Sequence, residues 1–351
     1  MLNLLDYSLK ELEEFFKKIG EKPFRARQIW KWVWEKGCDD FYKMTDLSKK
    51  TRSLLARHFT LKRPDVVEIK RSKDGTIKFL LRLKDAKLIE SVLIPEEDHY
   101  TLCVSSQVGC PLGCRFCNTG LMGFERNLTS GEILSQILIA RDFLDKEKIE
   151  VPLRNIVFMG MGEPLLNWYQ VKRALEIITD KNALSFSKRR TTVSTVGIPE
   201  ILLEFGKSNL GSLAVSLHAP DQKLREELMP RASKICHLKD LIMALKIFPL
   251  KSRQRITIEY ILIDGINDSL KHAKELCKIL SGIKCKINLI AYNPIEGLPY
   301  STPSEEKILE FENFLKEKNF TVTLRKSKGR DICAACGQLK ATRAVEEKEY
   351  V

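Results

Sequence analysis

The sequence lacks the hydrophobic runs that membrane proteins need. No stretch of its 351 residues approaches the roughly 18 uninterrupted apolar residues of a membrane-spanning helix. The N-terminal residues 1–15 lack the basic region followed by an apolar segment that is typical of secretion signals. Low-complexity segments and short-period repeats are absent as well. We therefore expect a globular protein of the cytoplasm, with no membrane partner.

Acidic residues are outnumbered by basic ones. The chain has 59 lysines and arginines against 46 aspartates and glutamates, a formal net charge of +13. Such an excess attracts a polyanion such as RNA through counterion release, although a basic surface can also serve solubility alone. One stretch, residues 49–63, has no acidic residue at all and holds six basic ones. These are Lys49, Lys50, Arg52, Arg57, Lys62 and Arg63.

The N-terminal third divides into a helical part and a β-rich part. Residues 10–20 and 26–37 have helical periodicity, and Gly37 stands at a natural helix end. We expect an accessory helical domain over residues 1–64 that binds RNA. Residues 65–98 contain three short β-rich runs separated by KDG and KDAK, which predicts an antiparallel meander.

From residue 99 to 325 the pattern predicts an α/β fold. Apolar strand-like runs alternate with amphipathic stretches, and six such β/α units fit a partial (β/α)6 barrel related to the TIM barrel. The expected strands are residues 101–106, 155–160, 191–197, 212–217, 255–263 and 286–292. Because chemistry sits at the C-terminal ends of parallel barrel strands, polar residues that follow these runs are site candidates. Residues 326–351 form a separate C-terminal segment.

Ten cysteines in a long chain without a secretion signal favour metal or thiol chemistry over a disulfide framework. Three of them, Cys110, Cys114 and Cys117, have C-x3-C-x2-C spacing on a loop after the first barrel strand. A cubane iron–sulfur cluster normally takes four thiolates, so three leave one iron open to a ligand. The alternative is a zinc site with Cys103 as fourth ligand, and metal analysis would discriminate the two.

The cysteine spacing resembles that of the radical S-adenosylmethionine superfamily, and Phe116 also fits the pattern. The resemblance implies one [4Fe-4S] cluster whose open iron binds the methionine end of S-adenosyl-L-methionine. After the strand at 155–160, the run Gly160-Met-Gly-Glu-Pro is similar to the GGEP motif of that superfamily. Gly162 and Glu163 are therefore expected at the cofactor, where a glycine admits a ligand and a carboxylate can meet an ammonium group.

Further strand-end residues match cofactor-binding positions of the superfamily by the same resemblance. They are Ser194, Ser216, Leu217, His218 and Asn293. Taken singly, serine and asparagine after a strand commonly cap turns, and a lone histidine is usually a satisfied structural group. Their shared location at successive strand ends favours the functional interpretation.

Nearly the whole chain resembles the RlmN-type adenine carbon-2 methyltransferases. The segments that carry this resemblance run from ARQIWKWVWEKG and TDLSKKTR through GFERNLTSGEI and KINLIAYNP to RKSKGRDICAACGQL. The family implies methylation of adenine carbon 2 in 23S rRNA and in tRNA. This carbon is electron-poor and cannot attack a sulfonium methyl group as a nucleophile, so a radical route is chemically sensible. The Cfr-type enzymes, which act at carbon 8, are the alternative, and Pro164 after Glu163 favours the carbon-2 group.

The RlmN resemblance assigns three catalytic roles. Cys336 matches the cysteine that carries the methyl group and becomes linked to the RNA base. Cys103 matches the thiol that resolves this adduct by attacking Cys336, which implies a disulfide bond between the two. Glu90 matches the proton acceptor, although alone it would be interpreted as an exposed carboxylate at a strand end.

Cys333 departs from the family pattern and makes a C-x2-C pair with Cys336. It could form an off-pathway disulfide that competes with Cys103, or it could be a small buried filler, and we favour the filler. The other four cysteines are expected to be buried inert thiols. They are Cys38, Cys236, Cys277 and Cys285.

The family resemblance also implies an external electron donor such as flavodoxin, and we expect a monomer. A competing hypothesis from another class is a non-enzymatic, zinc-stabilised RNA-binding protein. It accounts for the basic surface and the cysteine triplet, but it gives no reason for the GMGEP and CAACGQL segments.

Overall fold

A ten-stranded sheet forms the centre of the protein, in a computed structural model that describes residues 1–341. The strand order is β14-β13-β12-β11-β10-β9-β6-β5-β4-β3, and the two edges do not meet, so the barrel is open. The strands of this sheet are β3 Asp65–Arg71, β4 Ile77–Arg82, β5 Leu88–Pro95, β6 Tyr100–Cys103, β9 Leu153–Phe158, β10 Thr191–Thr195, β11 Ser212–Ser216, β12 Ile256–Leu262, β13 Cys285–Ala291 and β14 Val322–Arg325.

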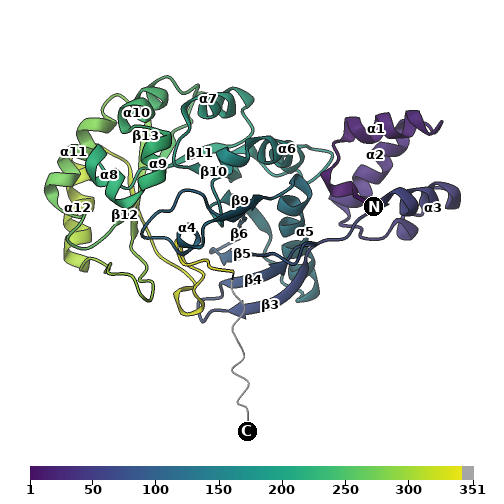
Figure 1. The fold of residues 1–351 in the computed structure, drawn as a ribbon, viewed down its shortest axis with the longest axis horizontal. Coiled ribbons are helices and arrows are strands. Elements are labelled where there is room, and N and C mark those ends of the chain that lie inside the picture. The colour runs from purple at the N-terminus through teal and green to yellow at the C-terminus, as the bar shows by residue number, and fades with distance from the viewer. Residues whose placement is uncertain (342–351) are drawn as a thin grey trace, which may run out of the picture.

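Helices surround this sheet and form a separate group at the N-terminus (Figure 1). The helices are α1 Leu9–Lys18, α2 Phe24–Trp30, α3 Lys49–His58, α4 Asn118–Met122, α5 Ser130–Lys146, α6 Trp168–Thr179, α7 Pro199–Ser208, α8 Gln222–Leu228, α9 Pro230–Ile235, α10 Leu238–Lys246, α11 Leu270–Leu280 and α12 Glu305–Glu317. No helix within residues 1–341 is long and apolar enough to cross a membrane.

The expected α/β fold with a partial barrel is confirmed. All six strands predicted for the barrel are present, and β6, β9, β10, β11, β12 and β13 pair in parallel. The prediction missed β14, which extends the sheet as a seventh parallel strand beside β13. Its four residues are half-buried or exposed at a sheet edge, so they lack the long apolar run that marked the central strands.

The antiparallel meander β3-β4-β5 continues the barrel sheet because β5 pairs antiparallel with β6. Successive side chains of β4 face opposite sides of this sheet. Phe79 packs edge-to-face on Phe143 of α5, with 5.2 Å between ring centroids, whereas Lys78 points to the opposite side. That opposite side is covered by the C-terminal segment, whose Cys333 carbonyl oxygen contacts Lys78.

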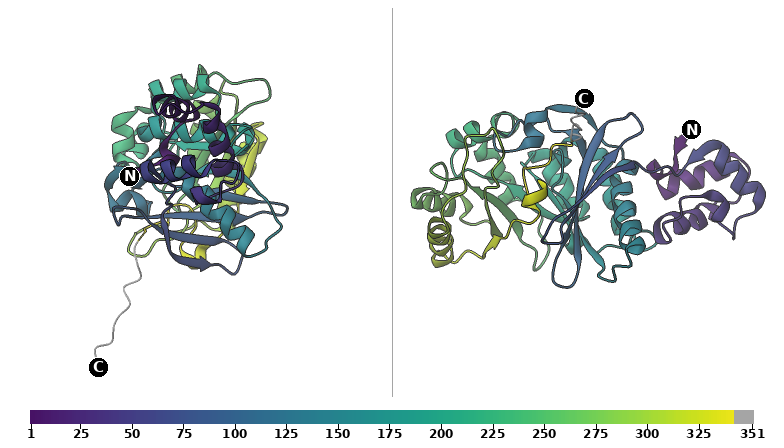
Figure 2. Two further views of the ribbon diagram at one scale, coloured as in Figure 1. Left: turned by 90° about the vertical axis from the view of Figure 1, so that its right-hand side faces the viewer. Right: turned by 90° about the horizontal axis from the view of Figure 1, so that it is seen from below.

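The N-terminal helices α1 to α3 form a lobe at one end of the molecule (Figure 2). Ser8 and Glu11 make a capping box that begins α1, and the helix expected at residues 26–37 is α2 followed by a π-turn, Lys31–Glu35. Gly37 follows this turn with φ +64°, the left-handed conformation that ends helices. Arg63 fastens this lobe to the barrel, since it donates to the Gly37 carbonyl oxygen at 2.6 Å and pairs with Asp142 of α5.

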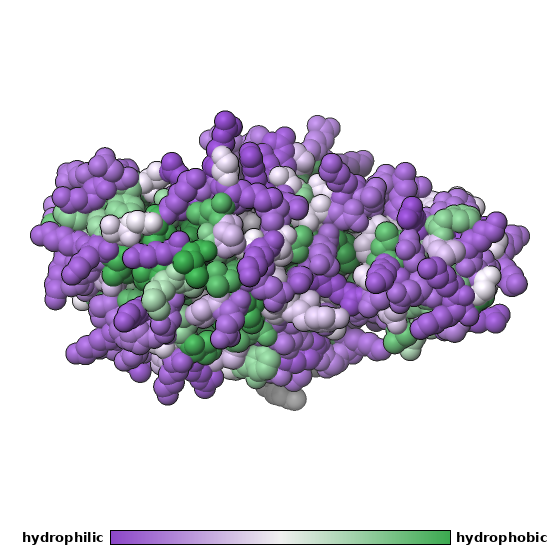
Figure 3. All heavy atoms as spheres, turned by 90° about the horizontal axis from the view of Figure 1, so that it is seen from above, coloured by the Kyte–Doolittle hydropathy of each residue, from purple (hydrophilic) through white to green (hydrophobic). Residues whose placement is uncertain are grey.

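The barrel and the N-terminal lobe differ in the hydropathy of their surfaces. Figure 3 shows apolar side chains gathered over the barrel half of one face, whereas the N-terminal lobe is mostly hydrophilic. In the basic run, Lys49, Lys50, Arg57 and Lys62 are exposed. The remaining two arginines of the run serve the fold, because Arg52 donates to the Tyr42 carbonyl oxygen and Arg63 holds the lobe in place.

Candidate active site

Two adjoining cavities open at the C-terminal ends of the parallel strands. The inner cavity, of about 160 Å³, is lined by Cys110, Cys114 and Cys117. The outer cavity, of about 350 Å³, is lined by Cys103 and by the basic side chains that follow β14. Cys336 lines both, so the C-terminal segment forms part of the wall between them.

The three cysteines of the C-x3-C-x2-C run lie on the loop between the hairpin strand β7 (Gln107–Gly109) and α4. Burial raises the pKa of Cys110 to about 12, raises that of Cys114 well above its usual value, and raises that of Cys117. All three line the inner cavity, so the spacing gathers them at one place. Metal binding deprotonates a cysteine outright, so these raised values describe the free thiols.

This donor set fits an iron–sulfur cluster. The thiols of Cys110 and Cys114, which are buried, and of Cys117, which is half-buried, share one cavity with the apolar side chains of Leu112 and Phe116, which limit access of water. Within residues 1–341, no three Cys, His, Asp or Glu side chains are close enough together to hold a single metal ion. A cubane cluster does not need that proximity, because each of its thiolates binds a different iron.

The glycine-rich turn after β9 lies against this cavity. Gly162 has φ +102°, and a Cβ atom there would lie 2.5 Å from the Cβ of Gln107, so only glycine fits. The carboxylate of Glu163 is buried and accepts backbone amides from Leu165 at 2.9 Å and from Val196 at 3.0 Å. Burial raises the pKa of Glu163. Both residues line the inner cavity.

The expected strand-end residues divide into two groups. Ser194, Ser216 and His218 line the inner cavity, and the two serine hydroxyls are 3.4 Å apart. Leu217 is fully buried and is not among the residues lining either cavity. Asn293 is also outside the two linings, and its side chain instead holds the C-terminal segment by donating to the carbonyl oxygen of Cys336 at 3.1 Å.

His218 combines both interpretations that the sequence left open. Its Nδ1 accepts a hydrogen bond from the backbone amide of Ile261 at 3.1 Å, so this nitrogen has a structural partner. The ring also packs edge-to-face on Phe116 of the cysteine loop, with 5.2 Å between centroids. Burial lowers the pKa of His218 to about 3, and Arg225 adds to this effect, so the ring is neutral at physiological pH.

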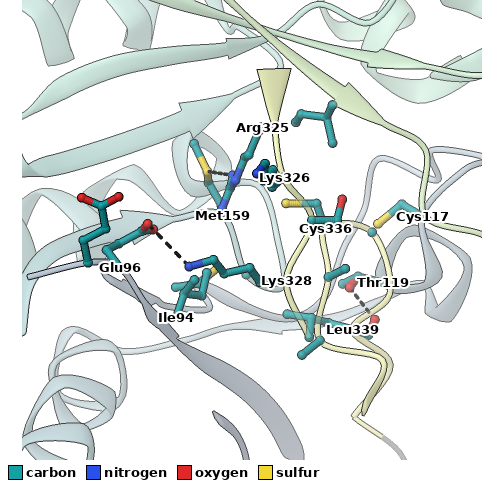
Figure 4. A pocket seen from close by; sticks show the side chains of 18 residues that line it. Ile94, Glu96, Cys117, Thr119, Met159, Arg325, Lys326, Lys328, Cys336 and Leu339 are labelled. Atoms are coloured by element: carbon teal, nitrogen blue, oxygen red, sulfur yellow. Dashed lines mark hydrogen bonds and ion pairs between the residues drawn. The ribbon is translucent and has the colours of Figure 1, made fainter. Parts of the chain in front are cut away.

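Cys103 and Cys336 face the same outer cavity from opposite ends of the chain. Burial raises the pKa of Cys103 to about 12, and Cys336 adds to the shift while Arg325 opposes it. All ten cysteines are free thiols, so the disulfide expected between Cys103 and Cys336 is not present in this structure. Figure 4 shows the Cys336 side chain lying between Arg325 and Cys117.

Glu90 differs from the expectation of an exposed strand-end carboxylate. It lies inside β5 and is 4% exposed, because β4 and the C-terminal segment cover it. Its Oε1 is 2.9 Å from the Nζ of Lys78, and its Oε2 accepts the backbone amide of Lys340 at 2.9 Å. Glu90 lines neither cavity, so the structure does not bring it together with the two thiols of the outer cavity.

Cys333 also differs from the favoured expectation. It is exposed, not a buried filler, because it ends the short helical turn Arg330–Ile332 with φ +51° and turns its carbonyl oxygen inward to Lys78. Among the four cysteines expected to be buried, only Cys236 is fully buried. Cys38, Cys277 and Cys285 are half-buried.

Arg325 was missed by sequence reasoning although it lines both cavities. The charge of Cys336 raises the pKa of Arg325, and the buried carboxylate of Glu259 adds to this effect while burial opposes it. Arg325 is the last residue of β14, so the rule that selects polar residues at strand ends would have found it had that strand been recognised. Lys328 lines the outer cavity only, where it pairs with Glu96 at 3.7 Å (Figure 4).

Two family models match the chain. Residues 2–61 match the ribosomal RNA large subunit methyltransferase N-terminal domain, and residues 104–277 match the radical SAM superfamily. Among curated proteins, the chain is 53% identical to the dual-specificity RNA methyltransferase RlmN of Nitratidesulfovibrio vulgaris strain DP4 over 349 residues, which cover 97% of this chain and 96% of that protein. It is 50% identical to the protein of the same name from Solidesulfovibrio magneticus, with 97% of both chains covered.

A solved structure supports the same relationship. The chain superimposes on a radical SAM methyltransferase from Sphaerobacter thermophilus with a TM-score of 0.91 and 41% sequence identity. The match covers 97% of this chain and all of that one. It therefore includes the N-terminal lobe, the open barrel and the C-terminal segment that carries Cys336.

Proposed function

Because the chain belongs to the RlmN family of dual-specificity RNA methyltransferases in the radical SAM superfamily, we propose that it methylates carbon 2 of adenine in RNA. The substrates proposed are 23S rRNA and tRNA. The observation that carries the proposal is the position of Cys336 between the cavity of the cysteine triplet and the cavity of Cys103. A methyl carrier must meet the cofactor on one side and the RNA base on the other.

The inner cavity is the proposed cofactor site. Cys110, Cys114 and Cys117 would hold a [4Fe-4S] cluster, and Gly162, Glu163, Ser194, Ser216 and His218 would surround S-adenosyl-L-methionine, with Leu217 supporting from the core. When bound, these groups supply the methyl group and the radical chemistry that an electron-poor carbon requires. The chain's own part is to hold them in a cavity from which apolar walls exclude water.

The outer cavity is the proposed site of the base. Cys336 would carry the methyl group and become linked to carbon 2 of the adenine. Cys103 would then attack the sulfur of Cys336, which breaks the bond between this sulfur and the methylene carbon, and Glu90 would take the proton from carbon 2. The resulting disulfide needs an external reductant before the next turnover. Arg325 supports this chemistry because its positive charge opposes the burial that keeps Cys103 a neutral thiol.

The N-terminal lobe is proposed to bind the RNA. Its exposed lysines and arginine in residues 49–62 form a basic surface that attracts phosphate groups. An electron donor such as flavodoxin, a monomeric state and the boundaries of the four expected domains stay predictions. The Cfr-type carbon-8 reaction and the non-enzymatic zinc protein are not favoured, because the curated relatives reported above are RlmN methyltransferases.

Product analysis tests the proposal. Protein reconstituted with iron and sulfide under anaerobic conditions, then supplied with reductant, S-adenosyl-L-methionine and RNA, should produce 2-methyladenosine, measured by nucleoside mass spectrometry. Production of 8-methyladenosine, or of no methylated adenosine on either RNA, would contradict it. Cys114→Ala should lose the iron and the visible absorption of the cluster, whereas Cys236→Ala, a buried cysteine outside the triplet, should keep both.

A further inference from the structure

A buried lysine that no sequence motif singled out joins the two catalytic parts of the site. Lys78 lies on β4, and only 8% of its side chain is exposed. A buried ammonium group is rare unless it is paired, because removing it from water is costly. Its surroundings should therefore show what it is for.

The Nζ of Lys78 has two partners that belong to different catalytic elements. It lies 2.9 Å from Oε1 of Glu90, whose side chain is 6% exposed. It also donates to the carbonyl oxygen of Cys333 at 3.1 Å, three residues before Cys336. One cation thus contacts both the proposed proton acceptor and the loop of the proposed methyl carrier.

The register of the sheet explains how this contact forms. Lys78 is opposite Val92, and Leu80 is opposite Glu90, in the antiparallel pair β4-β5. Lys78 and Glu90 are therefore diagonal neighbours on the same face, close enough for long side chains to meet. The C-terminal segment covers that face, and the amide of Lys340 donates to the second oxygen of Glu90 at 2.9 Å.

The C-terminal segment also contacts the turn between β3 and β4, but these contacts involve no residue with a proposed catalytic role. Ser72 and the amide of Lys73 donate to Asp331, and Asp74 accepts the amide of Gly329 at 2.7 Å. Lys78 differs from these anchors because it also contacts Glu90, the proposed proton acceptor.

We propose that Lys78 is a positioning residue that holds the carboxylate of Glu90 in register with the Cys336 loop for the step that releases methylated RNA. The inference rests on the proposed function. The Nζ of Lys78 holds one oxygen of Glu90 by an ion pair and donates to the Cys333 carbonyl oxygen, so it fixes the position of Glu90 relative to the loop that carries Cys336.

Stepwise assays separate this role from a general structural one. In Lys78→Met, methylation of Cys336 in the absence of RNA should stay within about 2-fold of the wild type. The covalent RNA adduct should also form at the wild-type rate. Release of methylated RNA from Cys336 should slow by roughly 100-fold or more, the usual size of a general-base contribution. Glu90→Gln should show the same pattern, and Lys78→Arg should recover release in part because it keeps the charge.

Two further variants complete the test. Arg82 also lies on β4, but it pairs with the half-exposed Asp65 and forms no ion pair with Glu90. Arg82→Met should therefore behave as wild type in all three assays. Lys78→Gln keeps a hydrogen-bond donor but no charge, and it serves if Lys78→Met fails to fold. Release by a folded Lys78→Met or Lys78→Gln at the wild-type rate would overturn the proposal, as would equal losses in Cys336 methylation and adduct release. A wild-type protein that methylates neither Cys336 nor RNA would instead refute the proposed function.

Discussion

The side-chain amide of Asn293 donates to the carbonyl oxygen of Cys336, with 3.1 Å between the two atoms. Its oxygen accepts a hydrogen bond from the Nε of Arg330 at 2.8 Å, so one buried asparagine holds both ends of the loop that carries Cys336. Asn293 lies two residues beyond the end of β13, and the expectation that it contacts the cofactor stays a prediction. In this structure its side chain fixes the loop at the strand end.

Replacing Asn293 by alanine should loosen this loop. Unpairing buried partners costs about 1–2 kcal/mol, which corresponds to a roughly 5- to 30-fold rise in the open population. Alkylation of Cys336 by iodoacetamide, followed by peptide mass spectrometry, should accelerate by that factor. The exposed Asn182→Ala is the matched control and should leave the rate unchanged. An unchanged rate in Asn293→Ala would show that the other anchors alone hold the loop.

Replacing Cys103 by alanine should trap the reaction at the adduct. Cys103 faces the outer cavity together with Cys336, and no other cysteine except Cys117 lines that cavity. Without the resolving thiol, RNA should stay covalently bound to Cys336, visible as a shifted protein band on a denaturing gel. Cys277→Ala, a half-buried thiol on α11, should turn over normally. Free methylated RNA from Cys103→Ala in multiple turnovers would refute the resolving role.

The barrel and much of the inner cavity could be predicted from sequence because both depend on local patterns. Parallel strands are continuous apolar runs, and their ends meet at one edge, so Ser194, Ser216 and His218 could be brought together without coordinates. The C-x3-C-x2-C spacing similarly fixes three thiols on one short loop.

The environment of Glu90 could not be predicted because it depends on contacts between distant segments. Its partners are Lys78 on the neighbouring strand and Lys340, which is 250 residues away. No periodicity in β5 distinguishes a carboxylate that faces water from one that faces a covering loop. The short edge strand β14 was missed for a related reason, and Arg325 was missed with it.

The exposed Cys333 predicts a specific sensitivity to oxidation. With the filler interpretation wrong, the alternative is a disulfide with Cys336, in which the two thiols give two electrons and two protons to an oxidant such as diamide. Brief diamide treatment should therefore link Cys333 to Cys336, detected by peptide mass spectrometry, and abolish methylation of Cys336 until dithiothreitol is added. In a Cys103→Ala background, which removes the other proposed disulfide partner of Cys336, Cys333→Ser should resist this inactivation, whereas Cys285→Ser should not. Equal sensitivity with and without Cys333→Ser in that background would contradict the pairing.

Asp74 predicts how acid affects the anchoring of the C-terminal segment. Burial acts to raise the pKa of Asp74, but hydrogen bonds from Thr76 and from the amide of Gly329 outweigh it and hold the pKa at about 2, below the ordinary 3.8. A carboxyl group whose pKa is lowered in the folded state stabilises the fold above its unfolded pKa and loses this effect as pH falls through the folded value. The contribution should therefore be complete above about pH 5 and decline from pH 4 toward pH 2.

Urea unfolding of wild type and Asp74→Asn measures this contribution. The midpoint of the variant should be lower than that of wild type at pH 7, and the gap should narrow between pH 4 and pH 3. Asp145→Asn, at an exposed position of α5, should show no gap of comparable size at any of these pH values. A gap for Asp74→Asn that stays constant down to pH 3 would mean that the carboxylate charge does not hold Gly329. The side-chain oxygen of asparagine would then accept the hydrogen bonds from Thr76 and Gly329 as well as the carboxylate does.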